Sequence, residues 1–124
     1  MRILNLTQHA ATDDQLDAGV VDMADWKAYL LRAYLSFDSV PTRELVEERA
    51  MKIAALAVVE SERPLAAMIG GAPWLMAPLE RALRDRDIPA LYAFSLRESV
   101  EETLPDGSVR KINVFRHAGF IDAV

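Results

Sequence analysis

The chain has 124 residues and a net charge of −5 at neutral pH, with 52% apolar and 27% charged residues. This length and composition predict one folded domain spanning residues 1–124 and exclude a disordered chain. The apolar share lies slightly above the usual ~45–50%, which favours a buried face shared with a second subunit. The acidic charge argues against a protein that binds duplex nucleic acid with its whole surface.

The absence of cysteine excludes disulfides, thiolate metal sites and a cysteine nucleophile. Two histidines are too few for a histidine-rich metal centre, so we expect no metal and no cofactor. The apolar stretches are shorter than the ~18 residues that span a membrane, and the start of the chain lacks the apolar run of a signal peptide. We therefore expect a cytoplasmic protein without membrane contact.

The first elements are read from short patterns. Residues 2–6 are mostly apolar and predict a buried strand, followed by a loop at residues 7–11. Thr12 and Gln15 form a capping-box pattern that predicts a short helix, which ends near Gly19.

Two longer helices are predicted next. The first covers residues 24–36 and ends before Pro41, with an apolar face of Trp26, Tyr29, Leu30, Ala33 and Phe37. The second begins after Thr42 and ends near Ser61, with an apolar face of Val46, Ala50, Ile53, Ala54 and Ala57.

The middle of the chain predicts a buried parallel strand at residues 65–69, which ends at Gly70-Gly71. A helix carrying Leu75 to Leu83 follows. Pro73 suits its first position, but Pro78 then requires a kink or a later start. Residues 90–94 are the third predicted core strand.

The last third predicts a hairpin. Residues 99–103 and 108–115 have strand character and flank Leu104-Pro105-Asp106-Gly107, a turn sequence. We expect Glu101 and Glu102 to face Arg110 and Lys111 across the two strands.

This order predicts an α/β protein: a small three-layer fold with a parallel core sheet and a C-terminal β-hairpin. Ligands of such sheets bind beyond the carboxyl ends of the strands. We expect these ends to converge on one rim built from residues 7–9, 70–72 and 95–97.

Several rim residues are candidates for chemistry. The backbone of Gly70 and Gly71 admits close approach of a ligand, and the helix that follows favours an anion; the alternative is an ordinary strand-to-helix turn. His9 is a candidate acid, base or donor, or a histidine that caps the next helix. Gln8 is a candidate donor to a phosphate or a base edge. Asn5 is expected to satisfy the neighbouring loop.

Basic residues of the last third form a second group of candidates. Arg97 and Arg116 lie near element ends and would hold an anionic ligand together with His117. His117 is equally a candidate structural histidine. For Arg110 and Lys111, cross-strand pairing is the favoured interpretation.

Four segments together resemble a known family: Asn5-Leu6-Thr7-Gln8-His9, Ala67 to Pro73, Leu91 to Glu98, and Pro105-Asp106-Gly107-Ser108-Val109 running on to Val114-Phe115-Arg116-His117. They are similar to the small stand-alone CRISPR-associated proteins related to CARF domains, which include ring nucleases. The resemblance covers the beginning and the second half of the chain and leaves residues 20–60 without a counterpart. This chain has Gly-Gly-Ala-Pro in place of the family's glycine-containing turn.

The resemblance implies a Rossmann-like fold, a homodimer and a cyclic oligoadenylate ligand, the second messenger of type III CRISPR systems. Ring nucleases open this ligand without a metal, because a ribose 2′-hydroxyl attacks the adjacent phosphate and leaves a 2′,3′-cyclic phosphate. The positions that would then act on the ligand are His9 or His117 for proton transfer, Arg97 with the Gly70 and Gly71 amides for charge stabilisation, Thr7, Gln8 and Ser95 for positioning, and Arg116 for binding.

Two other classes remain open at this stage. In the first, the protein is a sensor or a sequestering protein that binds a nucleotide without cutting it. Alternatively it is an interaction protein of a phage or mobile element that uses its apolar surface and hairpin edge to hold a partner.

Overall fold

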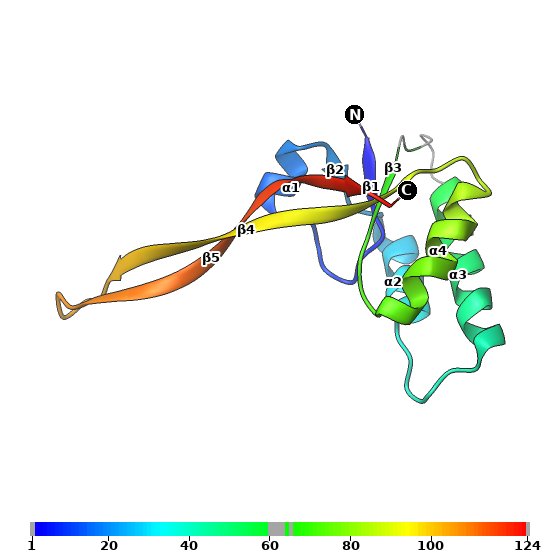
Figure 1. Ribbon diagram of the computed structural model, residues 1–124, viewed down its shortest axis with the longest axis horizontal. Helices are drawn as coiled ribbons and strands as arrows, with labels where there is room; N and C mark the ends of the chain where they lie inside the picture. Colours follow the sequence, from blue (N-terminus) through cyan, green and yellow to red (C-terminus); the bar gives the residue numbers. More distant parts are fainter. Residues whose placement is uncertain (1, 60–63, 65, 124) are drawn as a thin grey trace.

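The computed structural model describes residues 2–59, 64 and 66–123. In chain order the elements are β1 (Ile3–Asn5), α1 (Asp13–Asp17), β2 (Val20–Val21), α2 (Asp25–Leu35), α3 (Arg43–Val58), β3 (Ala66–Ile69), α4 (Pro73–Arg84), β4 (Ala90–Thr103) and β5 (Val109–Asp122). They form a five-stranded sheet in the order β2-β1-β3-β4-β5, in which β5 is antiparallel to β4 and the other neighbours are parallel (Figure 1). The α/β class, the parallel core and the C-terminal hairpin are confirmed.

The two faces of the sheet are covered unequally. The larger core joins α2, α3 and α4 to Leu4, Ala67 and Ile69 of the sheet and to Leu6, which follows β1. The smaller core contains Ile3, Val20, Ala66, Met68 and Leu91, against which Ala11 and Phe120 pack. Beside this second face lies α1, which contacts β2 and β5 and buries none of its own five residues. The third layer of the fold is therefore thin.

Local sequence signals place most helix ends correctly. Thr12 and Gln15 form the expected capping box, and the Thr42 hydroxyl accepts a hydrogen bond from the Leu45 amide at the start of α3. All five residues of the predicted α3 face are buried. The predicted end of that helix, Ser61, lies outside the described residues, and the helix ends at Val58. Helix α4 begins at Pro73 and keeps Pro78 in its interior.

The predicted face of α2 is correct for Leu30 and Phe37, which pack against the core, and wrong for Trp26, Tyr29 and Ala33, which are exposed. Leu31 and Leu35 are the buried side chains of this helix, whereas Trp26 and Tyr29 are 61% and 69% exposed. The aromatic residues share helical spacing and so resemble a core face, but Leu31 and Leu35, four positions apart, are the residues that join the core cluster with α3. The two-residue strand β2 also escaped prediction, because Val20 and Val21 show no alternation of their own.

The third core strand does not end at Phe94, and the hairpin is not a separate element. Strand β4 runs from Ala90 to Thr103, and β5 pairs with it along its whole length. Nothing between Phe94 and Ser99 breaks a strand, since this stretch has neither glycine nor proline. The register shifts between Phe94 and Ser95, which leaves Ala118 as an extra residue of β5.

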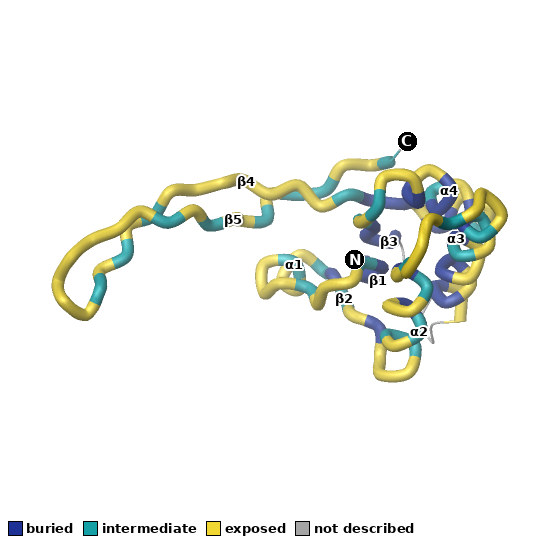
Figure 2. The backbone as a smooth tube through the Cα atoms, turned by 90° about the horizontal axis from the view of Figure 1, so that it is seen from below, coloured by how far each residue is buried: buried dark blue, intermediate teal, exposed yellow. Residues whose placement is uncertain are grey.

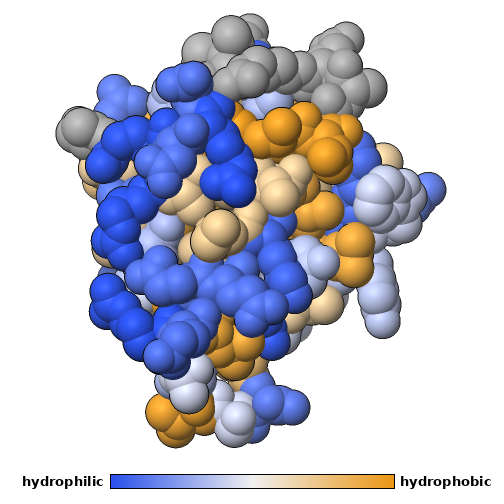
Figure 3. Space-filling model, turned by 90° about the vertical axis from the view of Figure 1, so that its right-hand side faces the viewer, coloured by the Kyte–Doolittle hydropathy of each residue, from blue (hydrophilic) through white to orange (hydrophobic). Residues whose placement is uncertain are grey.

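Residues 95–117, which we call the arm, project from the body as a two-stranded ribbon (Figure 1). Figure 2 shows that the buried residues gather in the body, whereas the arm is exposed or half-buried along its length. The helical end of the body, which faces the viewer in Figure 3, is covered by hydrophilic side chains with apolar ones between them. Among the described residues no helix has both the length and the apolar character needed to cross a membrane.

Candidate functional site

The sheet has a topological switch point between β1 and β3. The chain leaves β1 towards β2 on one side, and it leaves β3 towards β4 on the other. The two connections diverge and open a crevice at the carboxyl ends of β1 and β3, where ligands of open α/β sheets bind. The loop after β1, residues 6–12, and the turn after β3, residues 70–72, form its walls.

A buried asparagine holds the first of these walls. The Asn5 side chain is 3% exposed, and its Nδ2 donates to the His9 carbonyl and to Asp22 Oδ1, at 2.8 Å each. Its Oδ1 accepts from the amide and the hydroxyl of Thr7, at 2.9 and 2.7 Å. Asp22 in turn accepts from the Ala11 amide at 3.1 Å. The expectation that Asn5 satisfies the neighbouring loop is confirmed, and the loop is organised before any ligand arrives.

The second wall is the glycine turn. Gly71 has φ +137°, a conformation that residues with a side chain rarely adopt. A Cβ on Gly70 would lie 3.7 Å from Thr7 Cγ2, across the crevice. The turn leads into α4, whose N-cap residue Ala72 offers no side-chain hydrogen bond to the first turn. Pro73 has no amide hydrogen and the Leu75 amide bonds to the Ala72 carbonyl, so the first turn of α4 offers an anion the Trp74 amide and the helix dipole.

Two hollows flank the glycine turn. One, of about 470 Å³, is lined by Thr7, Gln8, His9, Ala10, Thr12, Gln15, Met68, Ile69, Gly70, Gly71, Tyr92 and Ala93. The other, of about 370 Å³, is lined by Gln8, Leu35, Ser36, Phe37, Gly70, Gly71, Ala72, Trp74 and Leu75. The fold therefore brings together five of the predicted site residues: Thr7, Gln8, His9, Gly70 and Gly71.

Some polar groups of this rim already make hydrogen bonds within the protein, and others do not. Gln8 donates from Nε2 to the Leu35 carbonyl at 3.3 Å, which ties the loop to the end of α2. The exposed His9 imidazole makes no hydrogen bond to any residue that the structure describes, so its nitrogens are open to a ligand. No lysine or arginine is among the described residues that line either hollow. An anion here would depend on amides, polar side chains and the helix dipole.

Sequence reasoning missed Tyr92 as a site residue. Its hydroxyl donates to Glu80 Oε2 of α4 at 2.5 Å, and with Ala93 it is the part of β4 that lines the larger hollow. Burial, together with the Glu80 carboxylate, raises the pKa of Tyr92 to about 12. Strand alternation alone did not reveal this role, because it places Tyr92 among ordinary core positions.

Trp74 and Phe37 were likewise missed as lining residues. Trp74 is 49% exposed and meets Phe37 edge to face, with ring centroids 4.8 Å apart. The Arg49 guanidinium lies 4.7 Å from the centre of the Phe37 ring and donates to three carbonyls at the end of α2. Phe37 and Trp74 therefore form an aromatic wall of the smaller hollow, and Arg49 packs against this wall.

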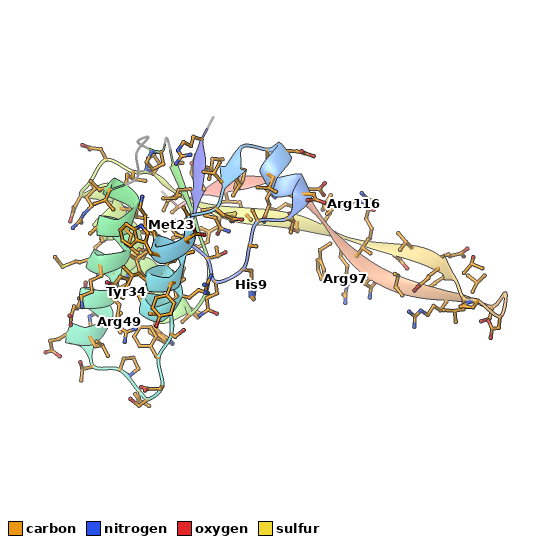
Figure 4. The ribbon with its side chains drawn as sticks, turned by 180° about the vertical axis from the view of Figure 1, so that it is seen from behind. His9, Met23, Tyr34, Arg49, Arg97 and Arg116 are labelled. Carbon is orange, nitrogen blue, oxygen red and sulfur yellow. The ribbon has the colours of Figure 1, made fainter. Side chains whose placement is uncertain are left out.

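The remaining predicted residues, Ser95, Arg97, Arg116 and His117, lie on the arm and not in the lining of either hollow. The expectation that three strand ends converge on the rim is therefore wrong for β4, which continues past it. Figure 4 shows Arg97 on the arm, beyond the loop that carries His9, with Arg116 on the other side of the ribbon. Their functional roles stay predictions.

The environments of these arm residues differ. Arg116 Nε contacts Glu98 Oε2 at 2.6 Å, and this partner raises the pKa of Arg116. Arg97 has no hydrogen-bonding or ionic partner among the described residues. His117 stands opposite Ser95, its ring contacts that of Phe120 at 4.7 Å, and its enclosed Nδ1 has no hydrogen-bond partner within the described part of the chain. Arg110 pairs with Glu102 at 2.8 Å, as expected, and Lys111 stands opposite Glu101.

A further hollow of about 400 Å³ lies at the amino end of β4, where Glu80, Arg84, Asp87, Ile88, Pro89, Ala90 and Ala123 line it. It sits at the opposite end of the strands from the rim, so the switch-point argument does not extend to it. No group of three His, Asp or Glu residues suited to a metal ion occurs among residues 2–59, 64 and 66–123.

Comparison with known proteins places the chain in a family. Neither the curated proteins nor the solved structures gave a significant match. The sequence model of one family matches residues 1–121, almost the whole chain. On this match the chain belongs to the uncharacterized protein MJ1673 family.

Proposed function

We propose that the rim between β1 and β3 binds a nucleotide phosphodiester, and specifically a cyclic oligoadenylate. The observation that carries this proposal is the crevice itself: a loop organised in advance by Asn5 faces the Gly70-Gly71 turn and the uncapped start of α4. Such a site suits a phosphate oxygen, which accepts hydrogen bonds from backbone amides. The choice of adenylate as the ligand comes from the sequence resemblance, because the family match assigns no activity.

Cleavage is the second part of the proposal. The ligand supplies its own nucleophile: a ribose 2′-oxygen forms a bond to the adjacent phosphorus, and its proton passes to a base. The bond from phosphorus to the 5′-oxygen breaks as that oxygen takes up a proton, which leaves a linear product with a 2′,3′-cyclic phosphate. The reaction balances without a co-reactant. The rim would align the two oxygens and stabilise the charge on phosphorus.

His9 is the group of this rim proposed to exchange the proton. It lines the larger hollow, and its imidazole is not engaged by any described residue. Proton transfer by a positioned side chain contributes about 10²- to 10⁴-fold to a rate. Arg97 and His117 would act only if the arm, of this or a second chain, closes over the rim.

The second candidate is a sensor or sequestering protein that binds the same ligand intact. The observation that favours it is the absence of lysine and arginine from the described lining of both hollows. A site without a cation stabilises a bound phosphodiester more readily than the extra charge of a phosphorane.

The test is incubation of the EDTA-treated protein with cyclic tri-, tetra- and hexa-adenylate, with products followed by mass spectrometry and binding by calorimetry. Linear products with cyclic-phosphate ends support cleavage. Binding with intact ligand supports the sensor, and absence of binding to all three rings overturns the proposal.

Single substitutions then separate the roles. His9→Ala should slow cleavage at least 10²-fold and leave binding largely intact. His117→Ala and Arg97→Ala test whether the second histidine and the unpaired arginine of the arm take part in cleavage. Arg110→Ala, near the tip of the arm, is the control, and unchanged turnover in His9→Ala, Arg97→Ala and His117→Ala would contradict the cleavage mechanism.

A further inference from the structure

The arm is the part of the molecule that the rim site leaves unexplained. From Ser95 to Thr103 it extends for nine residues at ~3.3 Å each, about 30 Å, which is close to the diameter of a small domain. Both of its faces are open beyond its base, where Asp14 of α1 interacts with Arg116; Figures 1 and 2 show no helix of the described residues along the rest of the ribbon. A two-stranded ribbon that stands alone in water is marginally stable at best.

One face of the arm carries an apolar stripe. Strand alternation and the observed register place Leu96, Val100, Ile112 and Val114 on the same side, continuing from Phe94 at the base. Val100 stands directly opposite Ile112 at the centre. Leu96 is 52% exposed, and the three central residues are half-buried only by their neighbours on the ribbon.

Two ion pairs bracket the centre of this stripe on the same face. On the body side Glu98 pairs with Arg116 at 2.6 Å, and on the tip side Glu102 pairs with Arg110 at 2.8 Å. The order along the face is therefore ion pair, apolar centre, ion pair. Such a surface is self-complementary: a half-turn about an axis that runs along the ribbon, between its two strands, lays Val100 of one copy on Ile112 of the other and brings the acidic strand of each ion pair over the basic one.

The charges favour the same arrangement. The arm has four Lys or Arg and four Asp or Glu residues, so the net charge of −5 resides on the rest of the chain. Two neutral arms do not repel each other, and repulsion between the acidic bodies is screened beyond about 8 Å at physiological ionic strength. A neutral face with an apolar centre is also a poor site for nucleic acid, which needs excess positive charge.

We propose that a second copy of this chain packs on this face, so that two arms join by their apolar stripes about a two-fold axis. The contact is isologous, since the same residues meet from both sides. Two stacked ribbons give each arm the second layer that it lacks. One face measures about 30 Å by about 10 Å, which is small beside the ~800 Å² per partner of a standard interface, so the dimer should dissociate on dilution. This inference does not depend on the ligand of the rim.

The test measures mass by light scattering and sedimentation over a wide concentration range up to the solubility limit. The wild-type chain should move from 13.8 kDa towards twice that mass as concentration rises. Ile112→Lys and Val100→Lys bury a charge in the contact and should weaken association at least 10-fold.

The matched controls are Asn113→Lys and Ser99→Lys. Ser99 and Asn113 stand opposite each other, one position along the strands from Val100 and Ile112, and therefore lie on the other side of the ribbon. Their substitution by lysine adds the same charge. They should associate like the wild type, and circular dichroism should show all four variants folded. A chain that stays monomeric throughout, or association weakened equally by both pairs of variants, overturns the proposal. Association unchanged in Ile112→Lys and Val100→Lys overturns it as well.

Discussion

The side chain of Asn5, at the end of β1, donates a 2.8 Å hydrogen bond to Asp22, which lies 17 positions later in the chain, just after β2. This bond crosses from one strand to the next and fixes the loop between them. Because Asn5 also binds the amide of Thr7 and the carbonyl of His9, one side chain determines the shape of one wall of the crevice.

Replacing Asn5 by Leu should therefore lower the free energy of unfolding by about 2–3 kcal/mol, since the Thr7 amide and Asp22 lose partners in a half-buried site. Urea unfolding measures the change. Gln8→Ala, which removes a single 3.3 Å bond to the Leu35 carbonyl, is the control and should cost less than about 1 kcal/mol. Equal costs would show that Asn5 does not organise the loop.

The two adjacent glycines should respond differently to alanine. Gly71→Ala forces a Cβ into a φ of +137° and should cost about 1–3 kcal/mol of stability. Gly70→Ala meets only Thr7 Cγ2 at 3.7 Å, an ordinary contact, and should change stability by less than about 0.5 kcal/mol. The methyl group that Gly70→Ala introduces nevertheless narrows the crevice, so this variant should bind a cyclic oligoadenylate more weakly. Thermal unfolding and calorimetry separate the two effects, and an unstable Gly70→Ala variant would contradict this account.

Alkaline pH should destabilise the protein through Tyr92. The phenol is neutral in both states below its ordinary pKa of 10.0, and burial with Glu80 raises the pKa of folded Tyr92 to about 12. Between these values the unfolded phenol ionises while the folded one does not, so the stability from this group is present below pH 10 and lost as pH rises towards 12.

Tyr92→Phe should remove this component of the pH dependence and cost about 1–2 kcal/mol at neutral pH through the lost hydrogen bond to Glu80. Urea unfolding of both proteins at neutral and alkaline pH gives the comparison. A parallel decline of the two curves would show that Tyr92 is not the group responsible.

Arg49 should be the arginine of α3 that matters for stability. Its Nη1 donates to the carbonyls of Ala33, Tyr34 and Ser36, and its guanidinium lies over Phe37. A cation at the end of α2 also interacts favourably with the helix dipole. Arg49→Met should lower the free energy of unfolding by about 2 kcal/mol. It should also loosen the Phe37–Trp74 contact, which lowers the fluorescence anisotropy of Trp74 when the other tryptophan is removed by Trp26→Phe. Arg43→Met removes an exposed ion pair with Glu47 at 3.5 Å and should be nearly neutral; a similar loss in both would refute the capping role.

Much of this architecture follows from local rules. The capping box at Thr12, the cap at Thr42, the buried run before Gly70 and the turn at Pro105-Asp106-Gly107 each depend on a few neighbouring residues, and each lies where the pattern predicts it. The rim residues Thr7, Gln8, His9, Gly70 and Gly71 were also predictable, because parallel strands present their carboxyl ends at one edge of the sheet.

Other features depend on contacts between distant segments, which periodicity does not encode. Leu31 and Leu35 rather than Trp26 and Tyr29 face the core because α3 packs against that side of α2. Strand β4 passes the rim and becomes an arm because β5 pairs with it over its full length, and this carries Arg97 and His117 away from the crevice. The amino-acid sequence alone determined the elements and the rim loops through short-range chemistry, whereas the tertiary structure decided which faces are buried and where the arm residues lie, because burial and strand pairing are set by partners far along the chain.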